Sequence, residues 1–179
     1  MITPYSPKNA KHSNDAHIAA QSQVYPKIFN TLQEKLSFET VTFDSNPRHK
    51  ILDGEMAVDR IVKVNINSLQ YPLSFTVQER FRRPDARKWQ DITITEWNHK
   101  SNLPSELYKL SGGLFVYGYY NQVTDIVEQF VVFSSSQVLL SLARGDLHWD
   151  VECNKRTKQT FIALSFKLLR DNGLILFEQ

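Results

Sequence analysis

The centre of the chain contains two strand-like segments, MAVDRIVKV at residues 56–64 and LSFTVQERFR at residues 73–82. Both are rich in β-branched and aromatic residues, and much of each alternates between apolar and polar residues, as half-buried strands do. Residues 65–72 connect them and include Asn65 and Pro72, which favour turns. The sequence therefore predicts an antiparallel β-hairpin.

One register of this hairpin keeps the apolar side chains on a common face. It pairs Val62 with Phe75 and Val64 with Leu73. Because side chains alternate between the faces of a strand, a shift by one residue would set the apolar face of one strand against the polar face of the other. We therefore expect the first register.

The same register predicts a patch of polar side chains on the other face. It places Asp59 opposite Gln78, with Arg80 one step further along, and directly opposite residues have Cβ atoms about 4.5–5.5 Å apart. Glu79 falls on the apolar side, where Arg60 is its natural ion-pair partner. A bulge that rotated the strand would instead bring Glu79 into the polar patch.

This patch combines a carboxylate, an amide oxygen and a cation. Mg²⁺ and similar hard cations take oxygen ligands, usually one or two carboxylates with water and substrate phosphate. A neighbouring cation can stabilise the charge that develops on a phosphoryl group. The alternative is an ordinary solvated or salt-bridged face. Asp53, Glu55 or Asp91 could complete a metal site, and Lys109 is an alternative cation.

The rest of the chain predicts further helices and strands. A helix from Ser13, Asn14 or Asp15 to about Leu36, kinked or divided at Pro26, is followed by a strand over residues 38–43 and a loop over residues 44–50. Further strands are expected over residues 91–95, 114–120, 126–133, 149–152 and 173–177, and helices over residues 104–110 and 136–144; residues 161–169 are ambiguous. The sum is an α/β (α+β, mixed sheet) fold with helices packed on a central sheet.

Length and composition favour one globular domain. The 179 residues include 11 Phe, 7 Tyr and 3 Trp, enough bulk for a core. Residues 1–13 are polar and interrupted by Pro, so we expect a flexible N-terminal tail before one domain over residues 14–179. The sequence lacks a long apolar run and a signal-peptide pattern, and it has one cysteine, so we expect an intracellular, cytoplasmic protein without membrane association.

The hairpin residues resemble the core motif of the PD-(D/E)XK nuclease superfamily, whose fold is restriction-endonuclease-like. That motif has an Asp at the head of one strand and (Glu, Asp or Gln)-x-Lys on its hairpin partner, which correspond here to Asp59 and to Gln78-Glu79-Arg80. The preceding helix and strand and the helix near Glu106 fit the superfamily's order of elements. The resemblance implies a nuclease-like domain with a central sheet flanked by helices.

The resemblance also implies a metal-dependent DNA endonuclease. Asp59 and Gln78 would hold Mg²⁺ (or Mn²⁺), and Arg80 would stabilise charge at the phosphorus. The basic cluster that follows would grip the DNA backbone through Arg82, Arg83, Arg87 and Lys88. Cleavage of both strands would require two copies, so a homodimer is the expected state.

Two departures from the motif lead to an alternative function. Arg80 replaces the lysine, and arginine stays protonated and cannot act as a base. Gln78 replaces an acid, so a metal would be held by one carboxylate fewer. The alternative is a catalytically inactive nuclease-fold protein that binds DNA or a protein partner; a scaffold without a nucleic-acid role is also compatible with the net charge of +2.

Other residues with chemical potential receive simpler interpretations. The five histidines show no metal-binding spacing and are expected to be isolated surface or capping residues, and Cys153 is expected to be an inert buried thiol. Tyr117, Tyr119 and Tyr120 could stack on nucleic-acid bases, but their apolar neighbours favour a place in the core.

Overall fold

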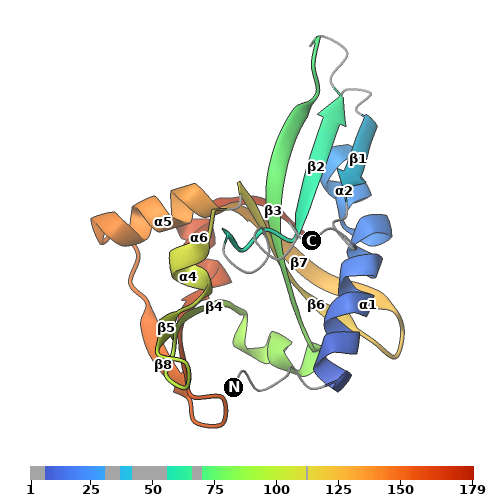
Figure 1. The fold of residues 1–179 in the computed structure, drawn as a ribbon. Coiled ribbons are helices and arrows are strands. Elements are labelled where there is room, and N and C mark those ends of the chain that lie inside the picture. Colours follow the sequence, from blue (N-terminus) through green and yellow to red (C-terminus); the bar gives the residue numbers. More distant parts are fainter. Residues whose placement is uncertain (1–6, 31–36, 42–55, 66–69, 112) are drawn as a thin grey trace.

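The structure, a computed structural model, describes residues 7–30, 37–41, 56–65, 70–111 and 113–179. It is a mixed α+β fold with two sheets (Figure 1). The larger sheet has the strand order β1 (Ser37–Val41), β2 (Arg60–Asn65), β3 (Leu73–Arg82), β6 (Leu114–Asn121), β7 (Ile126–Ser134) and β10 (Ile175–Glu178). The smaller sheet has the order β5 (Leu103–Pro104), β4 (Asp91–Asn98), β9 (Gln159–Ser165) and β8 (Asp150–Asn154).

Helices precede, join or follow these strands. They are α1 (Pro7–Gln23), α2 (Tyr25–Asn30), the 3-10 helix η1 (Pro84–Trp89), α4 (Glu106–Lys109), α5 (Ser135–Arg144) and α6 (Phe166–Asp171). No helix within the described part of the chain is long and apolar enough to cross a membrane.

The central hairpin has the predicted register. In the antiparallel pair β2–β3, Val62 lies opposite Phe75 and Val64 lies opposite Leu73. The other edge of β3 pairs with β6 in parallel, so β3 is an interior strand of a mixed sheet. Because the paired residues of β2 and β3 show no register shift, the orientation expected for the side chains at the end of the hairpin is retained.

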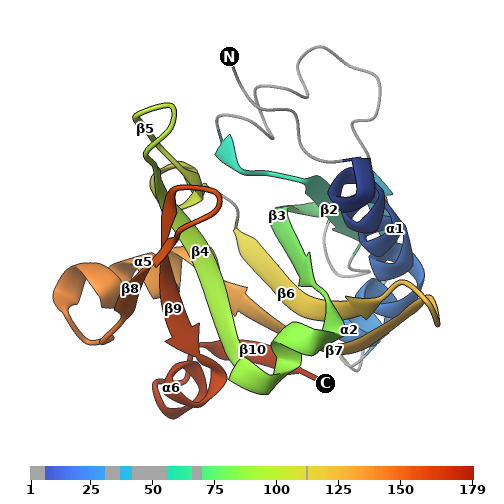
Figure 2. The ribbon, with the colours of Figure 1, turned by 90° about the horizontal axis from the view of Figure 1, so that it is seen from below.

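The larger sheet buries both faces, each against a different layer. The helices α1 and α2 cover one face, and the smaller sheet with α5 and α6 lies on the other (Figures 1 and 2). Strand β6 shows how alternation sorts the two cores: Phe115, Tyr117 and Tyr119 belong to the cluster with the smaller sheet, whereas Val116 and Tyr120 belong to the cluster with α1 and α2. The expectation that the three tyrosines are core residues is confirmed.

The second sheet corrects the expectation of one central sheet flanked by helices. The strand expected over residues 91–95 is present as β4, but it pairs with β9 and β5 instead of joining the hairpin. Ile92 and Ile94 are both fully buried in the hydrophobic cluster that the larger and smaller sheets share. Alternation predicts a strand with one buried face, but it does not say which sheet the strand joins.

The N-terminal boundary also differs from the prediction. Helix α1 begins at Pro7, so the expected tail over residues 1–13 is wrong for residues 7–13. Proline is tolerated in the first turn of a helix, because its missing N–H would have no partner there. The predicted division near Pro26 is confirmed, since α1 ends at Gln23 and α2 begins at Tyr25. The loop expected over residues 44–50 and the end of the first helix, residues 31–36, lie outside the described residues.

The remaining predicted elements are present with small shifts in their ends. The ambiguous segment at residues 161–169 is divided between β9 and α6, where the Ser165 side chain caps the helix by accepting from Leu168 N at 3.1 Å. Neither β5 nor η1 was predicted; η1 is separated from the end of β3 by one residue and carries part of the basic cluster.

Candidate functional site

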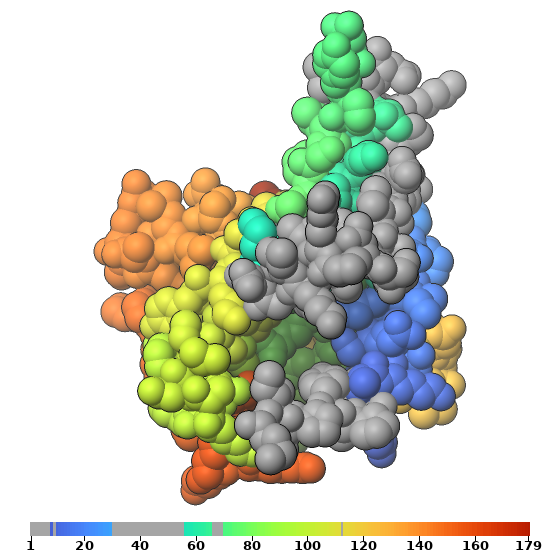
Figure 3. Space-filling model, in the orientation of Figure 1, coloured from blue at the N-terminus to red at the C-terminus, as the bar shows by residue number. Residues whose placement is uncertain are grey.

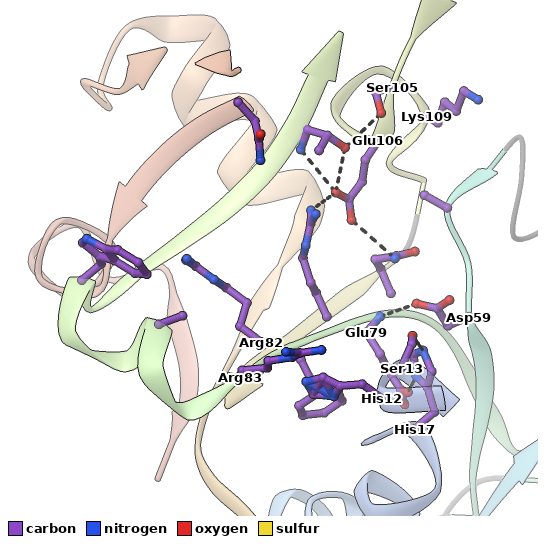
Figure 4. Close-up of a pocket in the computed structure, with 18 of the residues that line it drawn as sticks. His12, Ser13, His17, Asp59, Glu79, Arg82, Arg83, Ser105, Glu106 and Lys109 are labelled. Carbon is purple, nitrogen blue, oxygen red and sulfur yellow. Dashed lines mark hydrogen bonds and ion pairs between the residues drawn. The ribbon is translucent and has the colours of Figure 1, made fainter. Parts of the chain in front are cut away.

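A cavity of about 820 Å³ opens between α1, the end of the hairpin, η1 and α4. The space-filling view shows the surface hollowed between α1 and the segment around α4 (Figure 3). Its charged and polar lining comes from these elements and from β4 and β8: His12, Ser13, His17, Asp59, Gln78, Glu79, Arg80, Arg82, Arg83, Asp85, Thr95, Ser105, Glu106, Lys109 and Asn154. The cavity is therefore polar and of mixed charge, and Figure 4 shows these side chains converging from separate elements.

The three predicted site residues Asp59, Gln78 and Arg80 line this same cavity. Asp59 immediately precedes β2 and continues its pairing, because its backbone N–H donates to Val77 O at 2.9 Å. Its carboxylate accepts a hydrogen bond of 2.6 Å from the backbone N–H of Glu79. The aspartate is thus fixed at the junction of the two strands, on the cavity wall.

Gln78 is held by one end of its side-chain amide. Its Nε2 lies 3.5 Å from Glu106 Oε1, at the limit of a hydrogen bond. Its Oε1 is buried and has no hydrogen-bond partner among the residues that the structure describes. A buried carbonyl oxygen without a donor costs free energy, and a cation or a donor on a bound ligand would offset that cost.

Arg80 is ion-paired with Glu106 on α4 and also donates to Thr93 O at 3.0 Å. The Glu106 carboxylate additionally accepts from the backbone N–H and the hydroxyl of Thr95, each at 3.3 Å. Arg80 therefore connects β3 in the larger sheet with β4 in the smaller one. The sequence pointed to the helix near Glu106 but not to this residue, because the contact joins positions that lie 26 residues apart.

The Glu79 side chain lies on the opposite face of β3 from Gln78 and Arg80, as the register predicts. Its side chain is fully buried and its carboxylate accepts from Arg60 Nε at 2.7 Å, which confirms the expected ion pair. Two further partners were not predicted: the Tyr25 hydroxyl and His17 Nδ1. Arg60 also donates to the backbone oxygen of His17 at 2.6 Å, so the cluster attaches α1 to the hairpin.

The buried cluster shifts the pKa values of its members. Burial and the nearby Glu79 carboxylate raise the pKa of the Tyr25 hydroxyl well above its ordinary value, so Tyr25 remains a donor. Burial opposes charging of His17, but the hydrogen bond and charge of Glu79 outweigh it and raise the pKa of the imidazole above 6.5. The Asp59 carboxylate acts in the same direction, and Arg60 acts against it.

The predicted phosphate-gripping cluster divides into two parts. Arg82 and Arg83 line the cavity, whereas Arg87 and Lys88 are exposed on η1 outside the lining. Arg82 donates to Asp91 at 3.0 Å and lies 5.1 Å from the ring centroid of Trp89, over which Lys88 also lies at 4.5 Å. Arg82 is the last residue of β3, and Arg83 is the N-cap of η1. In the outer pair, Lys88 lies against the exposed Trp89 ring, whereas Arg87 donates to Gln129 at 3.0 Å.

The residues considered as alternatives for the metal site and its cation lie in different places. Asp91 is paired with Arg82, Lys109 lines the cavity, and Asp53 and Glu55 lie outside the described residues. Within the described ranges, no three His, Cys, Asp or Glu side chains are grouped so as to hold a metal ion.

Two of the simpler interpretations are wrong. His12 was expected to be an isolated surface or capping residue, but it is 6% exposed and lines the cavity. Its ring lies 5.5 Å from that of Tyr120, and neither ring nitrogen has a hydrogen-bond partner among the described residues. Burial and the charge of Arg83 lower the pKa of His12. Cys153 was expected to be buried, but it is exposed on β8. Neither residue lies in a segment whose alternation of apolar and polar residues defines a buried face, so the sequence did not predict their burial correctly.

Comparisons with protein-family models, curated proteins and solved structures give no match.

Proposed function

We propose that this protein is a metal-dependent DNA endonuclease that hydrolyses phosphodiester bonds at the cavity. The observation that carries the proposal is that Asp59, Gln78 and Arg80 line one cavity, where the amide oxygen of Gln78 is buried and has no partner within the described part of the chain. The order of α1, β1, the β2–β3 hairpin, α4 and β6 also fits the resemblance to PD-(D/E)XK nucleases.

The residues present fit a hard divalent cation. Asp59 supplies a carboxylate and Gln78 an amide oxygen, both ligand types that Mg²⁺ or Mn²⁺ accepts, and the unpartnered Gln78 Oε1 would gain a partner. When bound, the cation supplies Lewis-acid stabilisation of the charge on the phosphoryl oxygens. Arg82 and Arg83 line the same wall and would hold the DNA phosphate. Arg80, fixed by Glu106, presents a constant positive charge there.

A second function is favoured by a specific contact. Arg80 is engaged with Glu106, and Gln78 replaces the second carboxylate of the motif. A chain with the same cavity but no turnover would bind DNA through the cationic wall, and the salt dependence of binding would report the phosphate contacts. This is the inactive nuclease-fold alternative.

A cleavage assay on supercoiled plasmid separates the two functions. We expect the wild type to cut DNA with Mg²⁺ or Mn²⁺ and to stop when EDTA is added. Asp59→Asn keeps an oxygen that can accept from Glu79 N–H but removes the charge, so the variant should fold and cut at least about 100-fold more slowly. Asp150→Asn on the exposed strand β8 is the matched control and should cut as the wild type does.

Two results would contradict the proposal. Asp59→Asn that cuts at the wild-type rate would remove Asp59 from the site. A wild type that binds DNA with salt sensitivity but never cuts it would favour the second function. An Arg82→Ala/Arg83→Ala variant, which should lower the salt dependence of DNA binding, tests the cationic wall in either case. Sedimentation of the wild type with cleaved DNA tests the expected homodimer.

A further inference from the structure

The proposed hydrolysis needs a proton acceptor, and Arg80 does not supply one. Water attacking a phosphodiester must lose a proton, and arginine remains protonated at ordinary pH. The acidic residue nearest to Arg80, Glu106, is already its ion-pair partner. The described residues of the cavity wall, however, include a histidine that is oriented by a buried carboxylate.

Glu79 fixes the orientation of that histidine. The Glu79 side chain is fully buried, and besides His17 it is held by Arg60 Nε at 2.7 Å and by the Tyr25 hydroxyl. A carboxylate with three donors from three elements has little freedom to turn. An ionised carboxylate accepts hydrogen bonds but cannot donate one. The Glu79 carboxylate therefore places the proton of neutral His17 on Nδ1.

The other ring nitrogen of His17 is thereby left as the acceptor. Nε2 lies 3.2 Å from the Ser13 hydroxyl, one turn earlier on α1, and both residues line the cavity. The ring stands edge-on to Phe81 at a centroid distance of 6.4 Å. Figure 4 shows Ser13 and His17 beside Glu79, on the side of the cavity where Asp59 lies.

We propose that His17 is a catalytic residue that takes the proton of the attacking water, with Glu79 as its positioning residue; this inference rests on the proposed function. The water oxygen forms a bond to phosphorus while a phosphoester P–O bond breaks. The Ser13 hydroxyl turns its hydrogen away from His17 Nε2, the water proton passes to that nitrogen, and the leaving oxygen takes a proton from solvent. His17 then returns its proton to solvent, so that a diester and water become a monoester and an alcohol.

His12 is the competing histidine on the described part of the wall. Its two ring nitrogens have no hydrogen-bond partner among the described residues, so no described residue fixes which of them carries the proton. His17 differs because its carboxylate partner selects a tautomer and stabilises the imidazolium that forms when the proton arrives. The geometry therefore favours His17.

The test is a set of glutamine variants measured for binding, stability and cleavage. His17→Gln keeps a side-chain N–H that can donate to Glu79 but cannot take a proton. We expect it to bind Mn²⁺ and, in Ca²⁺ buffer, plasmid DNA as the wild type does, and to cleave at least about 100-fold more slowly. Added imidazole should restore part of the rate. His12→Gln and the exposed His99→Gln should cleave within about threefold of the wild type.

Four outcomes would overturn the inference. His17→Gln that cleaves at the wild-type rate would reject it and leave the proposed function standing. Slow cleavage without imidazole rescue, together with weaker DNA binding, would show a structural role. Loss of cleavage in Ser13→Ala to the same extent would make Ser13 the reacting group. A wild type that cleaves nothing would reject both proposals.

Discussion

Arg80 and Glu106 form an ion pair that joins the larger sheet to α4, which packs on the smaller one. The guanidinium is also held by Thr93 O, and the carboxylate by Thr95. The residue at the lysine position of the resemblance is thus a fixed cation that belongs both to the cavity and to the contact between the two sheets.

Removing Glu106 should therefore weaken the fold. Glu106→Ala leaves a half-buried Arg80 without its anion and Thr95 N–H without its acceptor, so we expect the free energy of unfolding to fall by about 1–3 kcal/mol. Urea denaturation measures the loss. Glu96→Ala is the control, because the Glu96 carboxylate accepts only from the exposed Tyr108 hydroxyl among the contacts described. A loss as large as that of Glu106→Ala would contradict the account.

The hydroxyl of Tyr25 should stabilise the buried Glu79 carboxylate. Tyr25→Phe keeps the ring in the core but removes a donor to a fully buried charge, at an expected cost of about 1.5–3 kcal/mol. Thermal or urea unfolding of the variant checks this value. The matched control is Tyr71→Phe, since Tyr71 is 73% exposed, and it should change stability by less than about 0.5 kcal/mol.

Gly118 should not tolerate a side chain. A Cβ at this position in β6 would lie 2.7 Å from Gln129 O and 2.9 Å from Phe130 Cβ, closer than carbon atoms pack. We expect Gly118→Ala to lose about 1–3 kcal/mol, because the strand would have to shift away from β7. Gly113→Ala offers the contrast: its nearest neighbour would be Thr76 O at 3.5 Å, so equal losses in the two variants would be inconsistent with the packing.

The contributions of the two cavity histidines to the free energy of unfolding should depend on pH in opposite directions. The folded-state pKa of His17 is raised, so its contribution is fully present below its unfolded pKa of 6.5 and is lost as pH rises through the folded pKa. The pKa of His12 is lowered, so its contribution is present above 6.5 and is lost as pH falls through its folded pKa. Denaturant unfolding from about pH 5.5 to about pH 8.5 measures both.

Single variants separate these two effects. Relative to the wild type, His17→Gln should lose more stability on the acidic side, and His12→Gln should gain relative stability there. His99→Gln, on an exposed turn, should follow the wild-type curve. Parallel curves for His17→Gln and the wild type would show that Glu79 does not stabilise the protonated imidazole.

The hairpin was predictable because its register depends on local alternation. Val62 and Phe75 can face the same core only in one pairing, so the positions of Asp59, Gln78 and Arg80 followed without long-range information. The ion pair of Glu79 with Arg60 followed from the same rule.

Contacts between distant elements could not be derived in this way. His17 and Tyr25 reach Glu79 across 62 and 54 residues, and no periodicity relates the helix to that position. The pairing of β4 with β9 could not be predicted for the same reason, since an alternating strand fits either sheet. The site is thus predictable along one hairpin, whereas the residues that α1 and α4 add to it depend on tertiary packing.

The most direct test of the central claim, that Asp59 and Gln78 hold a divalent cation in the cavity, is calorimetric titration of the apoprotein with Mn²⁺. We predict one Mn²⁺ bound per chain by the wild type and an affinity at least about 10-fold weaker in Asp59→Asn, with Asp150→Asn unchanged. Equal Mn²⁺ binding by the wild type and Asp59→Asn, or no binding by either, would contradict it.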